Sequence, residues 1–271
     1  MSSLSTATAS WLALRAAADD TARSTELAGL LARLLPLGPV VLHDLGAGTG
    51  GMTRWLAPRL PGPQEWVLRD GDAAIVDHLD LDAVTDDAGR PVHTTVVVEA
   101  LETLELRAFD GASAVTASAL LDVLTREEAA RIVSACVAGG APALFSLSVT
   151  GVVILDPPDA LDVAIGDAFN AHQRRDAEGR RLMGPDAAPV LARLFADAGW
   201  GVRTAPAPWH LGTADAPLIA AWLDGWVGAA VAQRPELSDD AEAYLVRRIA
   251  QLAEGALRVT VSHQDVLAWP R

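Results

Sequence analysis

Residues 40–52 constrain the fold of this 271-residue chain more than any other segment. They begin with the apolar run VVL (residues 40–42), which is typical of a buried strand. Asp44 follows, and residues 46–51 (GAGTGG) then lead into helix-compatible residues. Glycines let a backbone turn sharply and let a ligand approach without meeting a Cβ, and the next helix offers unpaired N–H groups to an anionic group. The segment therefore predicts a nucleotide-binding turn; the alternative, an ordinary tight turn, needs only one or two glycines.

Composition and charge narrow the class of ligand. The chain is 51% hydrophobic and 21% charged, which is typical of a globular protein with a substantial core. Its formal net charge of −14 argues against a nucleic-acid backbone or an anionic membrane surface as the main partner, and favours a small molecule. Cys136 is the only cysteine, which excludes an intrachain disulfide and a cysteine-based metal site. The spacing of His, Asp and Glu predicts no other metal site.

Two features of the chain predict a soluble, cytoplasmic protein. Residues 1–20 lack the basic start and the long apolar stretch of an ordinary secretory signal. The apolar runs of the chain are all shorter than the roughly 18 residues that a membrane-spanning helix needs.

Strand-like and helix-like segments alternate along the chain, as in a parallel sheet with crossover helices. Residues up to about Leu37 have helical character, and two helices precede the last strand. Strands are expected at residues 40–42, 65–70, 92–98, 112–118, 142–149, 201–204 and 257–262. The pattern predicts a doubly wound α/β fold.

The motifs within these elements resemble a known family. Residues 42–50, an apolar strand followed by an acid and G-x-G-x-G, resemble the first signature motif of class I S-adenosylmethionine-dependent methyltransferases. Asp70, which ends the second strand, matches the acid that in this family binds the ribose hydroxyls; one carboxylate can accept both hydroxyl protons. The resemblance implies a mostly parallel seven-stranded sheet of order 3-2-1-4-5-7-6 with a helical cap, and S-adenosylmethionine as the cofactor. It covers mainly residues 39–149.

A second resemblance and the domain organisation follow from the same elements. Residues 115–122 (VTASALLD) and 169–174 (FNAHQR) resemble a group of bacterial methyltransferase-like proteins to which no reaction is assigned. We expect one domain. It would consist of a helical N-terminal segment (residues 1–37), a cofactor-binding half (38–150), and a substrate-side half with the cap (151–271).

The family resemblance also implies where the cofactor is held. Its methionine part would lie over the glycine turn, and its adenine near residues 99–102. Asp44 would organise the ammonium end, directly or through water. The residues expected to contact the cofactor are therefore Asp44, Gly46, Ala47, Gly48, Gly50, Asp70, Ala117 and Ser118.

Residues 169–175 supply the candidates for catalysis. Methyl transfer from a sulfonium needs the nucleophile held about 3 Å from the methyl carbon, and it needs a base only if the acceptor loses a proton in that step. Asn170, His172 and Arg174 follow the fifth strand, and open α/β sheets bind ligands beyond the carboxyl ends of their strands. His172 would act as a base, and Arg174 would clamp a carboxylate or phosphate of an anionic acceptor. The alternative is a structural His172 and a solvated Arg174.

The sequence also offers further candidate residues, some of them with two interpretations. Trp222 and Trp226 are expected in the core, with a substrate-binding wall as the alternative. Trp209, His210 and His263 are weaker candidates for the site. Asp72 is a candidate helix N-cap or a ligand of the cofactor.

Three functions compete. The leading one is methyl transfer to a small molecule. The second is an NAD(P)-dependent oxidoreductase, because Gly46, Gly48 and Gly51 also satisfy G-x-G-x-x-G, with Asp70 as the ribose acid. Thr49 in the turn and the absence of lysine, which excludes the Tyr-Lys pair of one large dehydrogenase family, count against it. The third is a cofactor-binding module without catalysis, which would bind cofactor and form no methylated product.

Overall fold

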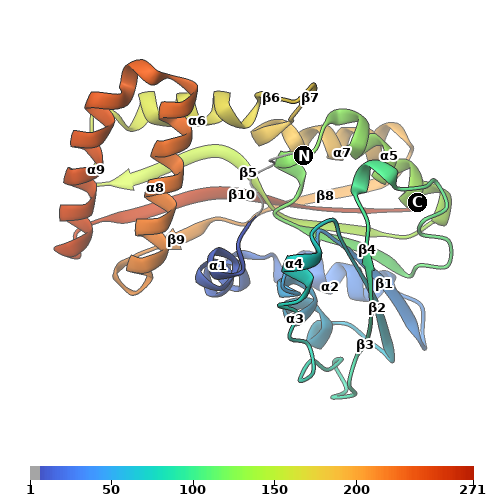
Figure 1. The fold of residues 1–271 in the computed structure, drawn as a ribbon. Coiled ribbons are helices and arrows are strands. Elements are labelled where there is room, and N and C mark those ends of the chain that lie inside the picture. The colour runs from blue at the N-terminus through green and yellow to red at the C-terminus, as the bar shows by residue number, and fades with distance from the viewer. Residues whose placement is uncertain (1–6) are drawn as a thin grey trace.

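The computed structural model describes residues 7–271, in which helices cover both faces of a twisted central sheet (Figure 1). The strands of this sheet lie in the order β3-β2-β1-β4-β5-β10-β8, and β9 pairs with β10. Their bounds are β1 Val40–Leu45, β2 Gln64–Asp70, β3 His93–Val98, β4 Ala114–Ser118, β5 Ala143–Asp156, β8 Gly201–Pro206, β9 Trp209–Leu211 and β10 Arg258–Trp269. A separate two-stranded ribbon is formed by β6 Asp176–Ala177 and β7 Arg180–Arg181.

The order of the seven main strands confirms the predicted fold. Strands β1 to β5 pair in parallel, whereas β10 is antiparallel to both β5 and β8. Numbered along the chain without the short β6, β7 and β9, the sheet reads 3-2-1-4-5-7-6. This is the mostly parallel α/β sheet that the methyltransferase resemblance implies.

Two strands extend furthest beyond their predicted ends. The sequence predicts that the fifth strand ends at Val149, but β5 continues to Asp156. The last strand is expected to end at Ser262, but β10 continues to Trp269. The cause is mutual pairing over a long register, from Ala268 opposite Ala143 to Arg258 opposite Asp156. Each strand satisfies the backbone hydrogen bonds of the other, which local sequence patterns do not reveal.

The helices form three groups around this sheet. Those near the glycine turn are α2 Thr25–Leu34, α3 Gly51–Leu56 and α4 Ala73–Val76. On the opposite face lie α5 Arg126–Gly139 and α7 Ala187–Asp197. The cap comprises α6 Asp162–Gln173, α8 Ala216–Gln233 and α9 Ser238–Ala253, while α1 Ala9–Ala22 packs against β9 and α8 (Figure 1). Within residues 7–271, no helix combines the length and apolarity needed to cross a bilayer.

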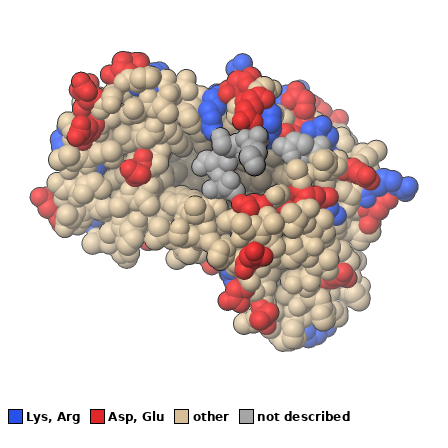
Figure 2. Space-filling model, in the orientation of Figure 1, with Lys and Arg blue, Asp and Glu red and all other residues tan. Residues whose placement is uncertain are grey.

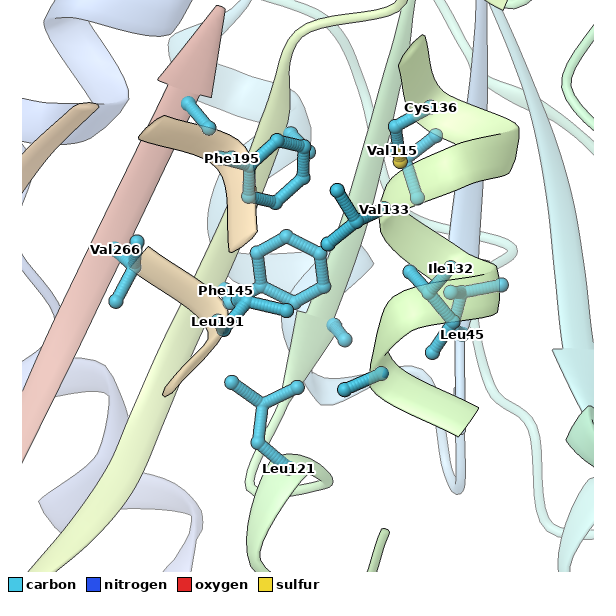
Figure 3. Packing of buried hydrophobic residues seen from close by; sticks show 14 of the residues in the cluster. Leu45, Val115, Leu121, Ile132, Val133, Cys136, Phe145, Leu191, Phe195 and Val266 are labelled. Carbon is cyan, nitrogen blue, oxygen red and sulfur yellow. The ribbon is translucent and has the colours of Figure 1, made fainter. Parts of the chain in front are cut away.

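One large apolar core lies between the sheet and the helices α5 and α7. In Figure 3, Phe145 of β5 lies between the α5 side chains Ile132 and Val133 and the α7 side chains Leu191 and Phe195. All of these side chains are buried. A second apolar cluster joins α2 and α3 to the other face of the sheet, and a third joins the cap to the extensions of β5 and β10. The cap therefore has its own core, which is built on the two long strands.

Arg248 of α9 ties the cap to the end of β5. The side chain is fully buried and pairs with Asp162, to which the Tyr244 hydroxyl also donates at 2.7 Å. The guanidinium further donates to the Pro157 carbonyl at 2.6 Å and to the Gln251 Oε1 at 2.8 Å. A buried charge is tolerated only when it is paired and hydrogen-bonded in this way.

We expect Arg248→Ala to lower the free energy of unfolding by about 3 kcal/mol, because it leaves a largely buried carboxylate without its counter-charge. The matched control is Arg247→Ala. Arg247 is half exposed, and its bond to Asp159 (2.9 Å) is a surface pair worth less than about 1 kcal/mol. Urea denaturation of both variants measures the difference. Equal losses would contradict the anchoring role of Arg248.

Candidate functional site

The glycine turn between β1 and α3 requires glycine at its tightest points. Gly46, Gly48 and Gly50 all have positive φ, at 60°, 56° and 80°. A Cβ on Gly46 would lie 2.9 Å from Leu120 Cδ1, closer than packed atoms approach. The turn can therefore bring its backbone against a neighbour or a ligand only because these side chains are absent.

Asp70 is held against this turn at the carboxyl end of β2. Its Oδ2 accepts a hydrogen bond from the Gly48 N–H at 2.8 Å, and its Oδ1 accepts one from the Asp72 N–H at 2.9 Å. Each carboxylate oxygen keeps a further lone pair that can accept from a ligand hydroxyl. Asp72 in turn caps α4, since its side chain accepts from the Ala74 N–H, so the N-cap interpretation of Asp72 is confirmed.

A cavity of about 670 Å³ lies beyond the carboxyl ends of β1, β2 and β4, a size typical of ligand pockets. Ala100 and Leu101 line it at the position predicted for adenine. Of the residues predicted to contact the cofactor, five line the cavity: Gly46, Ala47, Gly48, Asp70 and Ser118. The other three are placed behind the lining. Gly50 packs against Leu81, Ala117 is buried in the core, and Asp44 is buried under the turn.

Asp44 supports the turn from below. Its side chain accepts hydrogen bonds from the Thr116 hydroxyl at 2.8 Å and from the Thr53 hydroxyl at 3.3 Å. The residue is 1% exposed, and this burial raises the pKa of its carboxyl to about 7, against the opposing effect of the two threonines and of Arg23. Asp44, the acid of the motif, therefore connects β1 to β4 and to α3 through these two hydrogen bonds.

Arg23, at the end of α1, brings a positive charge to the large cavity. Its guanidinium donates to Asp20 Oδ1 at 2.6 Å and to Ser118 Oγ at 3.2 Å, and burial lowers the pKa of the group. An arginine keeps its charge under such conditions and suits a carboxylate. Sequence reasoning missed this residue, because an arginine three residues after an acid on a helix is typical of a solvated face.

A second, smaller cavity of about 160 Å³ adjoins the first. Arg15 and Ala119 line both cavities. The wall of the smaller one is mostly apolar and comes mainly from α1, β5, β9, the cap and β10. It includes Trp11, Leu147, Val149, Phe169, Trp209, Trp222, Trp226 and His263. Trp222 and Trp226, which stack at 5.0 Å, belong both to the core and to this wall.

Hydrogen bonds and a ring contact fix the side chains at the junction of the two cavities. Arg15 donates to Asp19 Oδ2 at 2.8 Å and lies 4.9 Å from the centre of the Trp209 ring, while the Trp209 Nε1–H donates to Asp19 Oδ1 at 3.0 Å. Ala119 and Leu147, at φ 52° and 57°, adopt the left-handed conformation that non-glycine residues rarely take. Such strain gathers at ligand sites that the surrounding structure holds in place.

The three predicted catalytic residues lie together at the end of α6, where Arg174 donates to the Asn170 carbonyl at 3.3 Å, but they do not converge on one cavity. Asn170 lines the smaller cavity, and its Nδ2 donates to the Gly151 carbonyl at 2.8 Å. Arg174 forms a bidentate pair with Asp186, at 2.6 and 2.8 Å, and lines neither cavity. His172 also lies outside both linings, and burial, together with Arg175, lowers its pKa. Catalytic roles for His172 and Arg174 stay predictions from the sequence.

Asp122 and His263 are two titratable groups that line the smaller cavity, and both lie within the electrostatic influence of Arg15. Burial raises the pKa of the Asp122 carboxyl, which Arg15 partly opposes. Burial and Arg15 together lower the pKa of His263 to about 4, so this ring is neutral near pH 7. Asp122 lies in the VTASALLD segment, but only the packing of α1 and the cap makes it part of a cavity. His210, the other weak candidate, hydrogen-bonds Thr260 at 3.3 Å and lines neither cavity.

Comparison with known proteins finds no matching family model and no matching curated protein. Among solved structures, the chain is similar to a mycolic acid cyclopropane synthase complexed with SAH and CTAB, at 16% identity and a TM-score of 0.49, over 89% of this chain and 82% of that one. A cyclopropane synthase from Mycobacterium tuberculosis is similar at 15% identity and a TM-score of 0.44, over 89% and 82%. Geranyl diphosphate methyltransferase in complex with SAM is similar at 15% identity and a TM-score of 0.43, over 90% and 84%. At these values the site has to be judged on its own geometry.

We expect Asp44→Asn to change the dependence of stability on pH. Its folded pKa of about 7 exceeds the ordinary value of 3.8, so between these values the folded wild type binds a proton that the unfolded chain has released. Raising the pH therefore destabilises the wild type, by about 1 kcal/mol per unit from pH 5 to 7, and the variant loses this slope. Urea denaturation at pH 5, 6 and 7 measures it, with the exposed Asp82→Asn as control. A difference between variant and wild type that is constant with pH would contradict the burial of an acid at this position.

Proposed function

We propose that the protein transfers a methyl group from S-adenosylmethionine to a small-molecule acceptor. One observation supports this most: a nucleotide-sized cavity with an acid at the end of β2 meets a smaller, mostly apolar cavity at Arg15 and Ala119. A reaction between two bound molecules requires adjoining sites that exclude water. Figure 2 shows that this face of the molecule is hollowed next to the cap.

The residues of the larger cavity fit S-adenosylmethionine in three places. Asp70 offers free lone pairs to the two ribose hydroxyls, and Ala100 and Leu101 offer an apolar surface to adenine. Arg23, which pairs with Asp20 through one nitrogen, would donate to the carboxylate of the methionine part through its remaining N–H groups, beside the backbone of Gly46 and Gly48. In this arrangement the sulfonium would lie toward Ala119, at the junction with the smaller cavity.

The chain itself contributes positioning and desolvation. Bound S-adenosylmethionine would supply an electrophilic methyl group. The Arg15–Asp19–Trp209 cluster holds the wall between the cavities rigid, and the tryptophans of the cap keep water from the acceptor. In-line displacement gains most from such fixed geometry, which can contribute about 7 kcal/mol or more to lowering a barrier.

We expect Asp70→Ala to weaken the binding of S-adenosylmethionine by at least about 1 kcal/mol, because a hydrogen bond to a charged group is worth about 1.5–3 kcal/mol. Isothermal titration calorimetry with the wild type and the variant measures this. Asp82→Ala, which removes an exposed acid outside the cavity lining, is the matched control and should bind as the wild type does.

The two rival functions predict different outcomes in the same titrations combined with a methyl-transfer assay. Micromolar binding of NADH or NADPH without binding of S-adenosylmethionine would support the oxidoreductase and overturn the proposal. Binding of S-adenosylmethionine with no transfer of a labelled methyl group to any component of a cell extract would support the non-catalytic module.

A further inference from the structure

The smaller cavity has the size of a single ring. Its volume of about 160 Å³ is close to the roughly 150 Å³ of an engineered apolar cavity that binds benzene. Flat side chains dominate its wall, with Phe169, Trp222 and Trp226 from the cap and Trp209 from β9. A compact, flat molecule would bury most of its surface here, whereas a long chain or a polymer would not fit.

Unpartnered polar atoms on the same wall indicate hydrogen bonds to a ligand. Within residues 7–271, four buried polar atoms of the cavity lining have no hydrogen-bond partner: Asn170 Oδ1, Gln173 Oε1, Trp226 Nε1 and His263 Nδ1. The Asp122 carboxyl also lines the cavity and forms no ion pair within these residues. Leaving such groups buried and unpaired is costly, and native proteins retain them mainly for a purpose. The two amide oxygens and the Asp122 carboxyl are hydrogen-bond acceptors, so the complementary ligand carries O–H or N–H groups.

The charges of the wall favour a neutral ligand. Asp122 and the amide oxygens of Asn170 and Gln173 would repel a carboxylate. Arg15 lines the same cavity and acts as a nearby positive charge on Asp122 and His263, while its counter-ion Asp19 is shared with Arg23, so an ammonium group would meet a like charge. His263 is neutral near pH 7. The sequence-based expectation of an anionic acceptor depended on Arg174, which pairs with Asp186 outside this cavity.

We propose that the smaller cavity binds the methyl acceptor, a compact neutral ring whose O–H or N–H is donated to Asp122. This inference rests on the proposed function, because it requires S-adenosylmethionine in the adjoining cavity. As the acceptor oxygen or nitrogen bonds to the methyl carbon, the bond from that carbon to sulfur breaks and its electron pair stays on sulfur. The acceptor proton passes to the Asp122 carboxylate. Asp122 is thus a catalytic residue that touches the reacting group.

Phenol, benzene, benzoate and benzylammonium are suitable probes, titrated by calorimetry into protein saturated with S-adenosylhomocysteine. We expect phenol to bind at least about tenfold more tightly than benzene, since a hydrogen bond to a charged group contributes about 1.5 kcal/mol or more. Benzoate and benzylammonium should bind more weakly than phenol. Asp122→Ala should lower the affinity for phenol to that for benzene, while Asp167→Ala, an exposed acid on α6, should leave it unchanged.

Val149→Phe tests the place of binding, because it fills the cavity from β5 and should abolish the binding of all rings. Binding of S-adenosylhomocysteine within about twofold of wild type shows that each variant is folded. Tighter binding of either charged probe, a phenol preference that survives in Asp122→Ala, or no binding of any neutral ring would overturn the inference. If S-adenosylhomocysteine itself fails to bind, the proposed function falls instead, and titrating phenol into the free protein still decides whether the cavity takes a neutral ring.

Discussion

The antiparallel pairing of β5 and β10 is the interaction on which the rest of the structure depends. It joins β10, and through β10 the edge strand β8, to the parallel strands, and it continues past them, from Ala143 opposite Ala268 to Asp156 opposite Arg258. The cap helices pack on this extension and share a core with it. Without the extension, the cap would have no surface on which to bury its tryptophans, and the smaller cavity would lack two of its walls.

The same arrangement joins two kinds of site. The parallel strands end at a glycine turn that brings backbone and the Asp70 carboxylate to one cavity, as open α/β sheets do. The long strands bring apolar side chains to the other cavity. Helix α1 bridges them, since Arg15 and Arg23 of the N-terminal segment line the cavities together with residues more than a hundred positions away. Chemistry at the junction therefore requires the whole chain to be folded.

Local patterns in the sequence predict the parts of the molecule that depend on local physics. The glycine turn, the acid at the end of β2 and the sheet order follow from motifs whose geometry requires those residue types. The ends of β5 and β10 do not, because their pairing partners are more than a hundred residues apart. The positions of Arg23 and Asp122 in the cavity linings are not predictable from local sequence either, because they depend on how α1 and the cap pack. Arg174 is the opposite case: the sequence suggests a ligand-binding residue, whereas the structure pairs it with Asp186 at the surface.

The central claim is that the cofactor points its reactive end at the junction of the two cavities, and a crystal structure with S-adenosylhomocysteine tests it most directly. We predict the ribose hydroxyls within hydrogen-bond distance of Asp70, the carboxylate beside Arg23, and the sulfur facing Ala119 and Arg15. A ligand in the reverse orientation, with its ribose away from Asp70 and its sulfur remote from Ala119, would contradict both the proposed reaction and the place of the acceptor.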